Sequence, residues 1–251
     1  MFERLPPPTI FAHRGASNYA PENTLAAFEV AVRQGAPAIE LDAKLSSDSQ
    51  VVVIHDQSVD RTTQGKGRVR DLSLEQLKQL DAGSFFDSGF AGERIPSLDE
   101  VFASVGKYIF INVELTNYAT PLDALPEKVA ALVRQHDLKK AVMFSSFNPL
   151  ALVRIRRLLP ECPIGLLALP GKAGAWARSG IGRLVGYQAL HPEASDVTQQ
   201  LVESAHRRGQ RVHVWTVNQE AQMKQLFGYK VDGIFTDDPP LALQVLATRR
   251  T

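Results

Sequence analysis

Short apolar blocks alternate along this chain with longer stretches in which apolar residues recur at helical spacing. The blocks are rich in Val, Ile, Leu and Phe, which is typical of buried strands. Strands are therefore expected at residues 9–13, 38–43, 108–115, 141–146, 163–168, 186–191, 211–217 and 233–236. Helices are expected at residues 24–34, 98–105, 122–135, 149–159, 174–179, 198–208, 219–227 and 240–248.

This order of elements repeats a strand followed by a helix eight times in 251 residues. Repeated strand–helix units favour a parallel sheet, and eight of them in this length predict an α/β fold of the (β/α)8 TIM-barrel type. Helix boundaries agree, because Asn23 or Thr24 can cap the first helix and Gly35 can end it. The helix at 174–179 is expected to be the weakest, since glycines surround it.

The second unit departs from the simple repeat. After residues 38–43 a turn leads into an apolar run, Val51–Ile54, which returns as a strand ending at His55. Residues 57–97 then contain several glycines and one helical patch at 73–80, and a segment of this length is too long for an ordinary connection. We expect an insertion that caps the barrel mouth within a single domain spanning residues 1–251.

Charge and composition limit the classes of partner. Lys plus Arg number 28 and Asp plus Glu number 27, and no basic block is present, so nucleic-acid binding is not expected. The N-terminus has no signal-peptide core and no window approaches about 18 apolar residues, so no stable membrane association is expected. The single cysteine, Cys162, suits a reducing compartment and therefore a cytoplasmic location. The oligomeric state is left open.

Carboxylates concentrate on two neighbouring strands of the predicted barrel. Strand alternation places Glu40 and Asp42 on the face opposite Ile39, and the third strand repeats the pattern with Asn112 and Glu114. Two like charges about 4 Å apart repel by about 4 kcal/mol at an effective dielectric constant of 20. Such a group needs a cation, and oxygen ligands without paired thiolates favour Mg²⁺, Ca²⁺ or Mn²⁺.

Two histidines end predicted strands at the same face of the barrel. His13 is followed by Arg14 and Gly15, which offer a fixed cation and a backbone that can approach a ligand closely, and His55 ends the return strand. A single histidine at a strand end is more often structural than catalytic. The coincidence of two histidines with three acids at the catalytic face favours a metal site with two imidazoles. His191 and His213 are left open between site and core.

Several longer motifs occur in a specific order. They are Ala12-His13-Arg14-Gly15, Pro21-Glu22-Asn23-Thr24, Glu40-Leu41-Asp42, His55-Asp56, Asp60-Arg61-Thr62-Thr63, Asn112-Val113-Glu114, Ser145-Ser146-Phe147, Val214-Trp215-Thr216 and Asp232-Gly233-Ile234-Phe235-Thr236-Asp237. In this order and spacing the chain resembles the glycerophosphodiester phosphodiesterase family over essentially its whole length.

This resemblance implies roles for individual residues. A divalent metal, usually Mg²⁺ or Ca²⁺, would be held by Glu40, Asp42 and Glu114. His13 and His55 would be the general acid and base, and Arg14 would bind the phosphate. Trp215 and Phe147 lie at strand ends and could form an apolar wall against glycerol carbons, or both could belong to the barrel core, an alternative that is stronger for Phe147.

One position departs from the family pattern. Many relatives have lysine two residues after the third metal glutamate, where this chain has Thr116. Lys44 shares a strand face with Glu40 and Asp42 and could supply the missing charge, or it could be a solvated lysine at the start of a turn. The departure bears on substrate preference and rate more than on the reaction class.

The resulting prediction is a metal-dependent hydrolase that converts a small-molecule glycerophosphodiester to sn-glycerol 3-phosphate and an alcohol. One alternative is a lysophospholipase D, which would need an apolar groove or exposed aromatics at the mouth. Phe85, Phe86 and Phe90 lie in the insertion but are expected to pack it onto the barrel. A second alternative is a catalytically silent barrel that binds phosphodiesters, although no metal acid or histidine of the pattern is missing.

Overall fold

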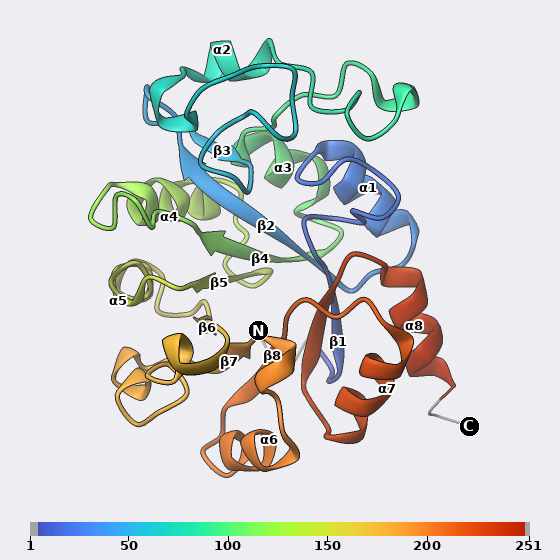
Figure 1. Ribbon diagram of the computed structural model, residues 1–251. Coiled ribbons are helices and arrows are strands. Elements are labelled where there is room, and N and C mark those ends of the chain that lie inside the picture. Colours follow the sequence, from blue (N-terminus) through green and yellow to red (C-terminus); the bar gives the residue numbers. More distant parts are fainter. Residues whose placement is uncertain (1–4, 249–251) are drawn as a thin grey trace.

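The computed structural model describes residues 5–248, and a closed barrel of eight parallel strands forms the centre of this part of the chain (Figure 1). Strand β1 pairs with both β2 and β9, which closes the sheet. The predicted TIM barrel is therefore confirmed. Residues 1–4, which belong to the N-terminal segment considered for a signal peptide, lie outside the described residues. The parallel strands are β1 (Thr9–Ala12), β2 (Ala38–Leu45), β4 (Phe110–Leu115), β5 (Val142–Ser146), β6 (Ile164–Ala168), β7 (Ala189–Pro192), β8 (Arg211–Val214) and β9 (Gly233–Thr236).

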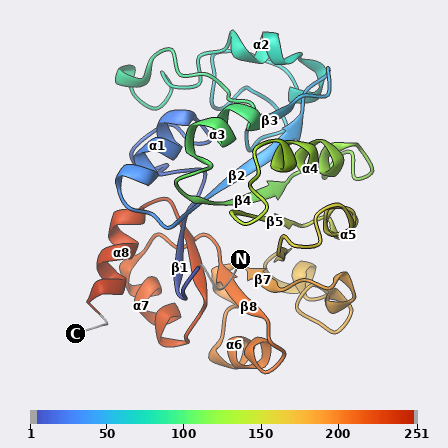
Figure 2. The ribbon, with the colours of Figure 1, turned by 180° about the vertical axis from the view of Figure 1, so that it is seen from behind.

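Helices surround the barrel on its outer face, as both ribbon views show (Figures 1 and 2). Their apolar sides pack on the outward-facing residues of the strands and form the main hydrophobic core. The helices of this outer ring are α1 (Leu25–Arg33), α3 (Leu98–Val105), α4 (Leu125–Gln135), α5 (Pro149–Leu158), α6 (Gln199–His206), α7 (Glu220–Gly228) and α8 (Pro239–Ala247).

Strand alternation separates the two faces of β2 as the sequence predicts. Ile39 and Leu41 point outward and share one apolar cluster with Phe28 of α1 and Phe102 of α3. The alternate residues of β2 point into the barrel, and β2 pairs with β4 so that Glu40 lies beside Asn112 and Asp42 beside Glu114. The interior below them is filled by a cluster of Phe11, Ala38, Met143, Ala189 and Phe235. The polar side chains are thus collected at one end of a packed barrel.

The start of α1 resolves the choice between two possible caps. Thr24 is the N-cap, and its hydroxyl accepts a hydrogen bond from the backbone N–H of Ala27. Asn23 instead has a φ of 58°, and its side-chain amide donates to Asp42 Oδ2 over 2.9 Å. Gly35, with a φ of 77°, follows the end of the helix. The residue before the cap is therefore free to hold a carboxylate of the barrel.

The prediction of a helix at residues 174–179 is wrong. Two 3-10 turns, η4 (Gly171–Gly174) and η5 (Gly182–Val185), stand between β6 and β7 in the described chain. A Cβ atom on Gly174 would lie 1.8 Å from the carbonyl oxygen of Leu169, and one on Gly182 would lie 2.4 Å from that of Ala177. The segment folds back on itself so tightly that these positions require glycine, and this compact path replaces a continuous helix.

Residues between β2 and α3 form a separate layer beside the barrel (Figure 1). Strand β3 (Val51–Val53) runs antiparallel to β2, and η2 (Val69–Asp71), α2 (Leu74–Lys78) and η3 (Ser88–Phe90) follow it. This layer has its own apolar cluster, which includes Val59 and Leu77. Phe85 and Phe86 do not pack onto the barrel as expected: they are 44% and 38% exposed. In both views their segment, between α2 and α3, lies at the outer edge beyond α1 (Figures 1 and 2).

Candidate active site

A cavity of about 110 Å³ opens at the carboxyl ends of the barrel strands. In (β/α)8 proteins this is the end at which catalytic side chains gather. The sequence predicts eight site residues, and the fold brings all of them to the lining of this one cavity. They are His13, Arg14, Glu40, Asp42, His55, Glu114, Phe147 and Trp215.

Three carboxylates form the charged centre of the cavity. Glu40, Asp42 and Glu114 each offer an oxygen within 4.8 Å of the others, and Glu40 and Asp42 are buried. Burial, followed by the charge of Asp42, raises the pKa of both glutamates. Burial acts most strongly on Asp42 and would raise its pKa, but the charge of Arg14 and smaller contributions, among them the hydrogen bond from Asn23, together outweigh burial and lower that pKa. Three acids this close together are destabilised without a counter-charge, so the group fits a divalent cation.

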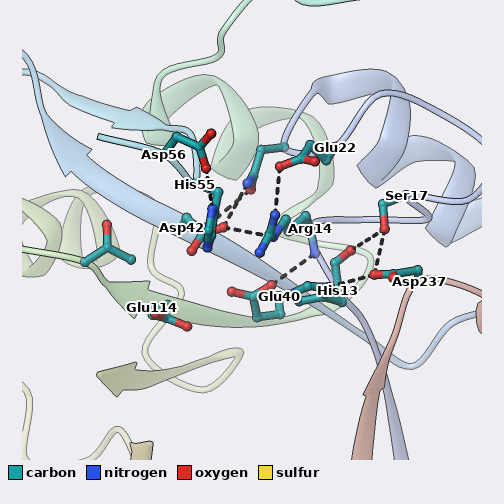
Figure 3. A network of polar contacts seen from close by, with 12 residues as sticks. His13, Arg14, Ser17, Glu22, Glu40, Asp42, His55, Asp56, Glu114 and Asp237 are labelled. Carbon is teal, nitrogen blue, oxygen red and sulfur yellow. Dashed lines mark hydrogen bonds and ion pairs between the residues drawn. The ribbon is translucent and has the colours of Figure 1, made fainter. Parts of the chain in front are cut away.

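His13 is oriented by a carboxylate that directly follows the last strand of the barrel. Its Nδ1 lies 2.7 Å from Asp237 Oδ1, and Asp237 also accepts a hydrogen bond from Ser17 Oγ at 3.0 Å (Figure 3). Asn218 Nδ2 donates a further hydrogen bond to Asp237 over 2.6 Å. The carboxylate therefore accepts the Nδ1 proton. Nε2 is left as the ring nitrogen without a hydrogen bond to any described residue.

His55 has the same arrangement on the other side of the site. Its Nδ1 lies 2.7 Å from Asp56 Oδ1. Arg61 Nε donates to Asp56 Oδ2 over 2.7 Å, and this bond is the main reason that the pKa of Asp56 falls to about 2. The guanidinium of Arg61 also donates two 2.7 Å hydrogen bonds to Glu22. Each histidine therefore has a carboxylate partner on Nδ1, and the partner of His55 is held by an arginine.

Arg14 lies among the acids with a left-handed backbone, at a φ of 56°. Its backbone N–H donates to Glu40 Oε2 over 3.0 Å, and its Nη1 donates to Glu22 over 2.9 Å (Figure 3). Its Nε is 3.5 Å from Asp42 Oδ2. The guanidinium charge is therefore already balanced by two carboxylates. The chain can turn so closely because Gly15 follows, where a Cβ would lie 2.7 Å from Ala27.

Aromatic rings form one wall of the cavity. Phe147 packs edge-on against Trp215 with ring centroids 5.6 Å apart, and Tyr118 packs edge-on against Phe147 at 5.7 Å. The Tyr118 hydroxyl donates to Glu114 Oε1 over 2.5 Å. Burial, followed by the charge of Glu114, raises the pKa of Tyr118 well above its usual value, so the hydroxyl stays protonated. This ring row connects the apolar wall to the carboxylate group.

The sequence alone assigns no role to four polar partners of the site, namely Asp56, Asp237, Tyr118 and Arg61. Asp56 directly follows a strand-end histidine, and Asp237 directly follows the last strand, so position alone could have marked both. Tyr118 and Arg61 come from long connections and carry no such signal. Their contribution depends on how those connections fold.

Comparison with known proteins gives the family. The Glycerophosphoryl diester phosphodiesterase family model matches residues 13–241. The chain belongs to this family. A glycerophosphodiester phosphodiesterase of Caldanaerobacter subterraneus subsp. tengcongensis is 40% identical over 238 residues, which cover 94% of this chain and 97% of that protein. One of Bacillus altitudinis is 34% identical over 242 residues, covering 94% and 97%.

Solved structures agree with this membership in the glycerophosphoryl diester phosphodiesterase family. A phosphodiesterase of Oleispira antarctica, solved in complex with the product sn-glycerol-3-phosphate, matches with a TM-score of 0.87 and 32% identity over 96% of this chain and 97% of that chain. A glycerophosphodiester phosphodiesterase of Agrobacterium tumefaciens matches with a TM-score of 0.81 and 30% identity over 94% and 99%. The chain is therefore an enzyme of the phosphoric diester hydrolase class.

The residues whose role the sequence does not decide, His191, His213 and Lys44, do not line the catalytic cavity. His191 and His213 are fully buried inside the barrel, and His213 Nδ1 lies 3.1 Å from His191 Nε2. The interpretation of Lys44 as a solvated lysine is wrong, because it is 5% exposed and donates to Thr116 Oγ1 over 2.6 Å. None of the helices within residues 5–248 is long and apolar enough to cross a bilayer. A cytoplasmic location stays a prediction.

Proposed function

We propose that this enzyme hydrolyses glycerophosphodiesters to sn-glycerol 3-phosphate and an alcohol such as choline, ethanolamine or glycerol. The observation that carries the proposal is one cavity with three clustered carboxylates and two histidines, each with a carboxylate on Nδ1. The product complex of the Oleispira antarctica phosphodiesterase supports the identity of the phosphate product.

The carboxylates Glu40, Asp42 and Glu114 would hold one divalent cation, Mg²⁺, Ca²⁺ or Mn²⁺. Their hard oxygen donors fit these ions, and their mutual repulsion calls for one. Asn112 adds support because its Oδ1 is buried in the same lining without a hydrogen-bond partner. When bound, the cation would offset charge on the phosphate.

His13 and His55 would divide the proton transfers. One imidazole takes the proton of the attacking oxygen through Nε2, and the other gives a proton to the oxygen of the departing alcohol. Asp237 and Asp56 keep each Nδ1 protonated and each ring fixed, which leaves the opposite nitrogen for the reaction. The same pair serves whether the attacking oxygen belongs to water or to the glycerol 2-hydroxyl of the substrate.

Substrate contacts would come from the remaining lining residues. Arg14 Nη2 makes no hydrogen bond to a described residue and could reach a phosphate oxygen, while its other nitrogens are held near Glu22 and Asp42. Phe147 and Trp215 would pack against the glycerol carbons. The substrate is a small molecule, so no nucleic-acid partner is proposed.

We also propose that residues 57–97 are an insertion within one catalytic domain. Arg61 supports this because its guanidinium joins Asp56, beside His55, to Glu22 in the loop before α1. The insertion would then fix the second histidine against the barrel and would not fold as a separate unit.

A single assay tests the proposal. Purified enzyme is incubated with glycerophosphocholine or a lysophospholipid in Mg²⁺, Ca²⁺ or EDTA, and sn-glycerol 3-phosphate and choline are measured. Turnover of glycerophosphocholine should require the cation and should fall by at least about 100-fold in His13→Ala, since acid–base catalysis contributes that much. His206→Ala, which removes an exposed imidazole on α6, is the matched control. Turnover in EDTA would refute the cation requirement, and preference for the lysophospholipid would replace the proposed substrate.

A further inference from the structure

Lys44 is a buried cation at the carboxyl end of β2. It follows Asp42 on the inward face of the strand, and its side chain crosses to the end of β4, where Nζ donates to Thr116 Oγ1 over 2.6 Å. Thr116 uses its own proton in a 2.7 Å hydrogen bond to the carbonyl oxygen of Ala43. The threonine hydroxyl is therefore oriented as an acceptor and fixes where the ammonium lies.

The ammonium has no ion-pair partner within the described residues, although the residue is only 5% exposed. An ammonium carries three donors, and one of them is used. The more exposed lysines Lys78, Lys139 and Lys224 each pair with a glutamate. Burying a charge without an opposite charge is unfavourable, so an anion that reached Nζ would be bound strongly.

The ammonium lies next to the carboxylates of the site, because Asp42 and Glu114, which pair across β2 and β4, stand two residues before Lys44 and Thr116 on these strands. Asp42 and Glu114 are the carboxylates that act most strongly on its charge, although neither is within ion-pair distance. On its other side Lys44 lines a second cavity, of about 180 Å³, between the insertion and the loop after β4. Thr116 and Arg70 line the same cavity. The ammonium thus lies between the carboxylate group and this second cavity, just outside the lining of the catalytic cavity.

Arg14 offers a contrast within the same site. Its guanidinium lies against Glu22 and Asp42, so its charge is largely offset before any substrate binds. Lys44 feels the carboxylates only from beyond ion-pair distance and makes no ion pair within residues 5–248. A phosphodiester carries one negative charge, with which this ammonium can pair directly.

We propose that Lys44 is a phosphate-binding residue, whose ammonium donates to a non-bridging oxygen of the substrate phosphodiester while Thr116 positions it. This rests on the function proposed above. On this proposal the site gains a second cation, the ammonium of Lys44 from β2, which one hydrogen bond to Thr116 holds at the end of β4.

The first test measures binding of sn-glycerol 3-phosphate by calorimetry at a fixed Mg²⁺ concentration. Lys44→Met, which keeps the length of the side chain and removes the charge, should bind about 10- to 100-fold more weakly, as expected for a hydrogen bond between charged groups. Lys107→Met removes an exposed charge before β4, at the opposite end of the barrel, and should bind as the wild type does.

Thermal unfolding separates this role from a structural one. Since the ammonium is buried without an ion pair, Lys44→Met should unfold at the same or a higher temperature than the wild type while binding more weakly. A lysine that only supports the fold would give the reverse, with a lower unfolding temperature and unchanged affinity. That result would overturn the proposal.

A charge-relocation variant completes the test. Lys44→Thr should lose affinity, and combining it with Thr116→Lys should restore most of it, because the second lysine starts where the first one ends. A folded double variant that binds no better than Lys44→Thr would assign the loss to packing and overturn the proposal. If the wild type itself neither binds sn-glycerol 3-phosphate nor cleaves glycerophosphocholine, the proposed function fails instead.

Discussion

Tyr118 is the side chain through which the apolar wall of the cavity meets the carboxylate group. Its ring packs against Phe147, and its hydroxyl occupies Glu114 Oε1, so that Oε2 is the oxygen left for a cation. Hydrogen bonds of this kind orient metal ligands and affect affinity without touching the ion. The phenol of Tyr118 is well suited to orienting Glu114, because its hydroxyl stays protonated beside the carboxylate and so continues to donate its hydrogen bond.

Tyr118→Phe isolates that hydroxyl, since it keeps the ring against Phe147. We expect the affinity for Mg²⁺ or Mn²⁺ to fall by about 10-fold or more, because loss of such a contact typically costs this much. Calorimetric titration of the cation measures it directly. Tyr19→Phe is the control: the hydroxyl of Tyr19 also donates to an aspartate, Asp238, but does so at the surface. Equal cation affinity in the two variants would show that Glu114 needs no support.

At the scale of elements, Arg61 joins two connections that otherwise belong to different parts of the chain. It contacts Asp56 after β3 and Glu22 before α1, and through them it reaches His55 and Arg14. Its side chain is 46% exposed, and exposed ion pairs contribute little to stability. Its main effect should therefore be on the geometry of the site.

Arg61→Met should lower kcat by about 10- to 100-fold, because a small displacement of a catalytic group has effects of that size. The unfolding temperature should change by only a few degrees, since about 1 kcal/mol corresponds to roughly 2–4 °C in a protein of this size. Arg154→Met is matched, because Arg154 also binds a carboxylate with two nitrogens, Glu127, but does so between α5 and α4 outside the barrel. Similar kcat losses in both variants would contradict the role given to Arg61.

The order of the strands and the residues that face the barrel interior could be predicted, because in a barrel the position of a residue along its strand determines where its side chain lies. Alternation determines the face on which a side chain lies, and the parallel register determines the end, so Glu40, Asp42 and Glu114 follow from two short motifs. Contacts made by loops could not be predicted this way. Asp237 orients His13 across 224 residues of sequence, and only closure of the barrel between β1 and β9 brings them together.

The segment expected as a helix at 174–179 failed for a different reason. Its local pattern is compatible with a helix, but Gly174 and Gly182 allow the backbone to approach Leu169 and Ala177 more closely than any side chain would permit. The path of this segment depends on tertiary contacts, which cannot be recognised from the local spacing of apolar residues. The same holds for Lys44, whose burial depends on the neighbouring end of β4.

For the molecule as a whole, the imidazoles of His191 and His213 determine part of the response to acid. Burial lowers the pKa of His191 to about 3 and that of His213 well below its usual value, where the charges of His191 and Arg211 add to the effect. In the unfolded chain both groups titrate near 6.5. Below that pH the unfolded chain binds protons that the folded barrel excludes, so stability is full above about pH 6.5 and falls as the pH decreases toward 3.

Glu40 and Glu114 act in the opposite direction without a cation, because burial raises their pKa values and the folded state then gains protons first. Denaturant unfolding of the wild type and of His191→Gln, both in EDTA between pH 7.5 and 5, cancels this shared contribution. The variant should lose up to about 1.4 kcal/mol less stability per pH unit, the value of one excluded proton. His206→Gln removes an exposed imidazole and serves as the control. If His191→Gln kept the wild-type slope, the buried pair would not be the acid-sensitive part of the barrel, and its protons would have to be accommodated within the fold.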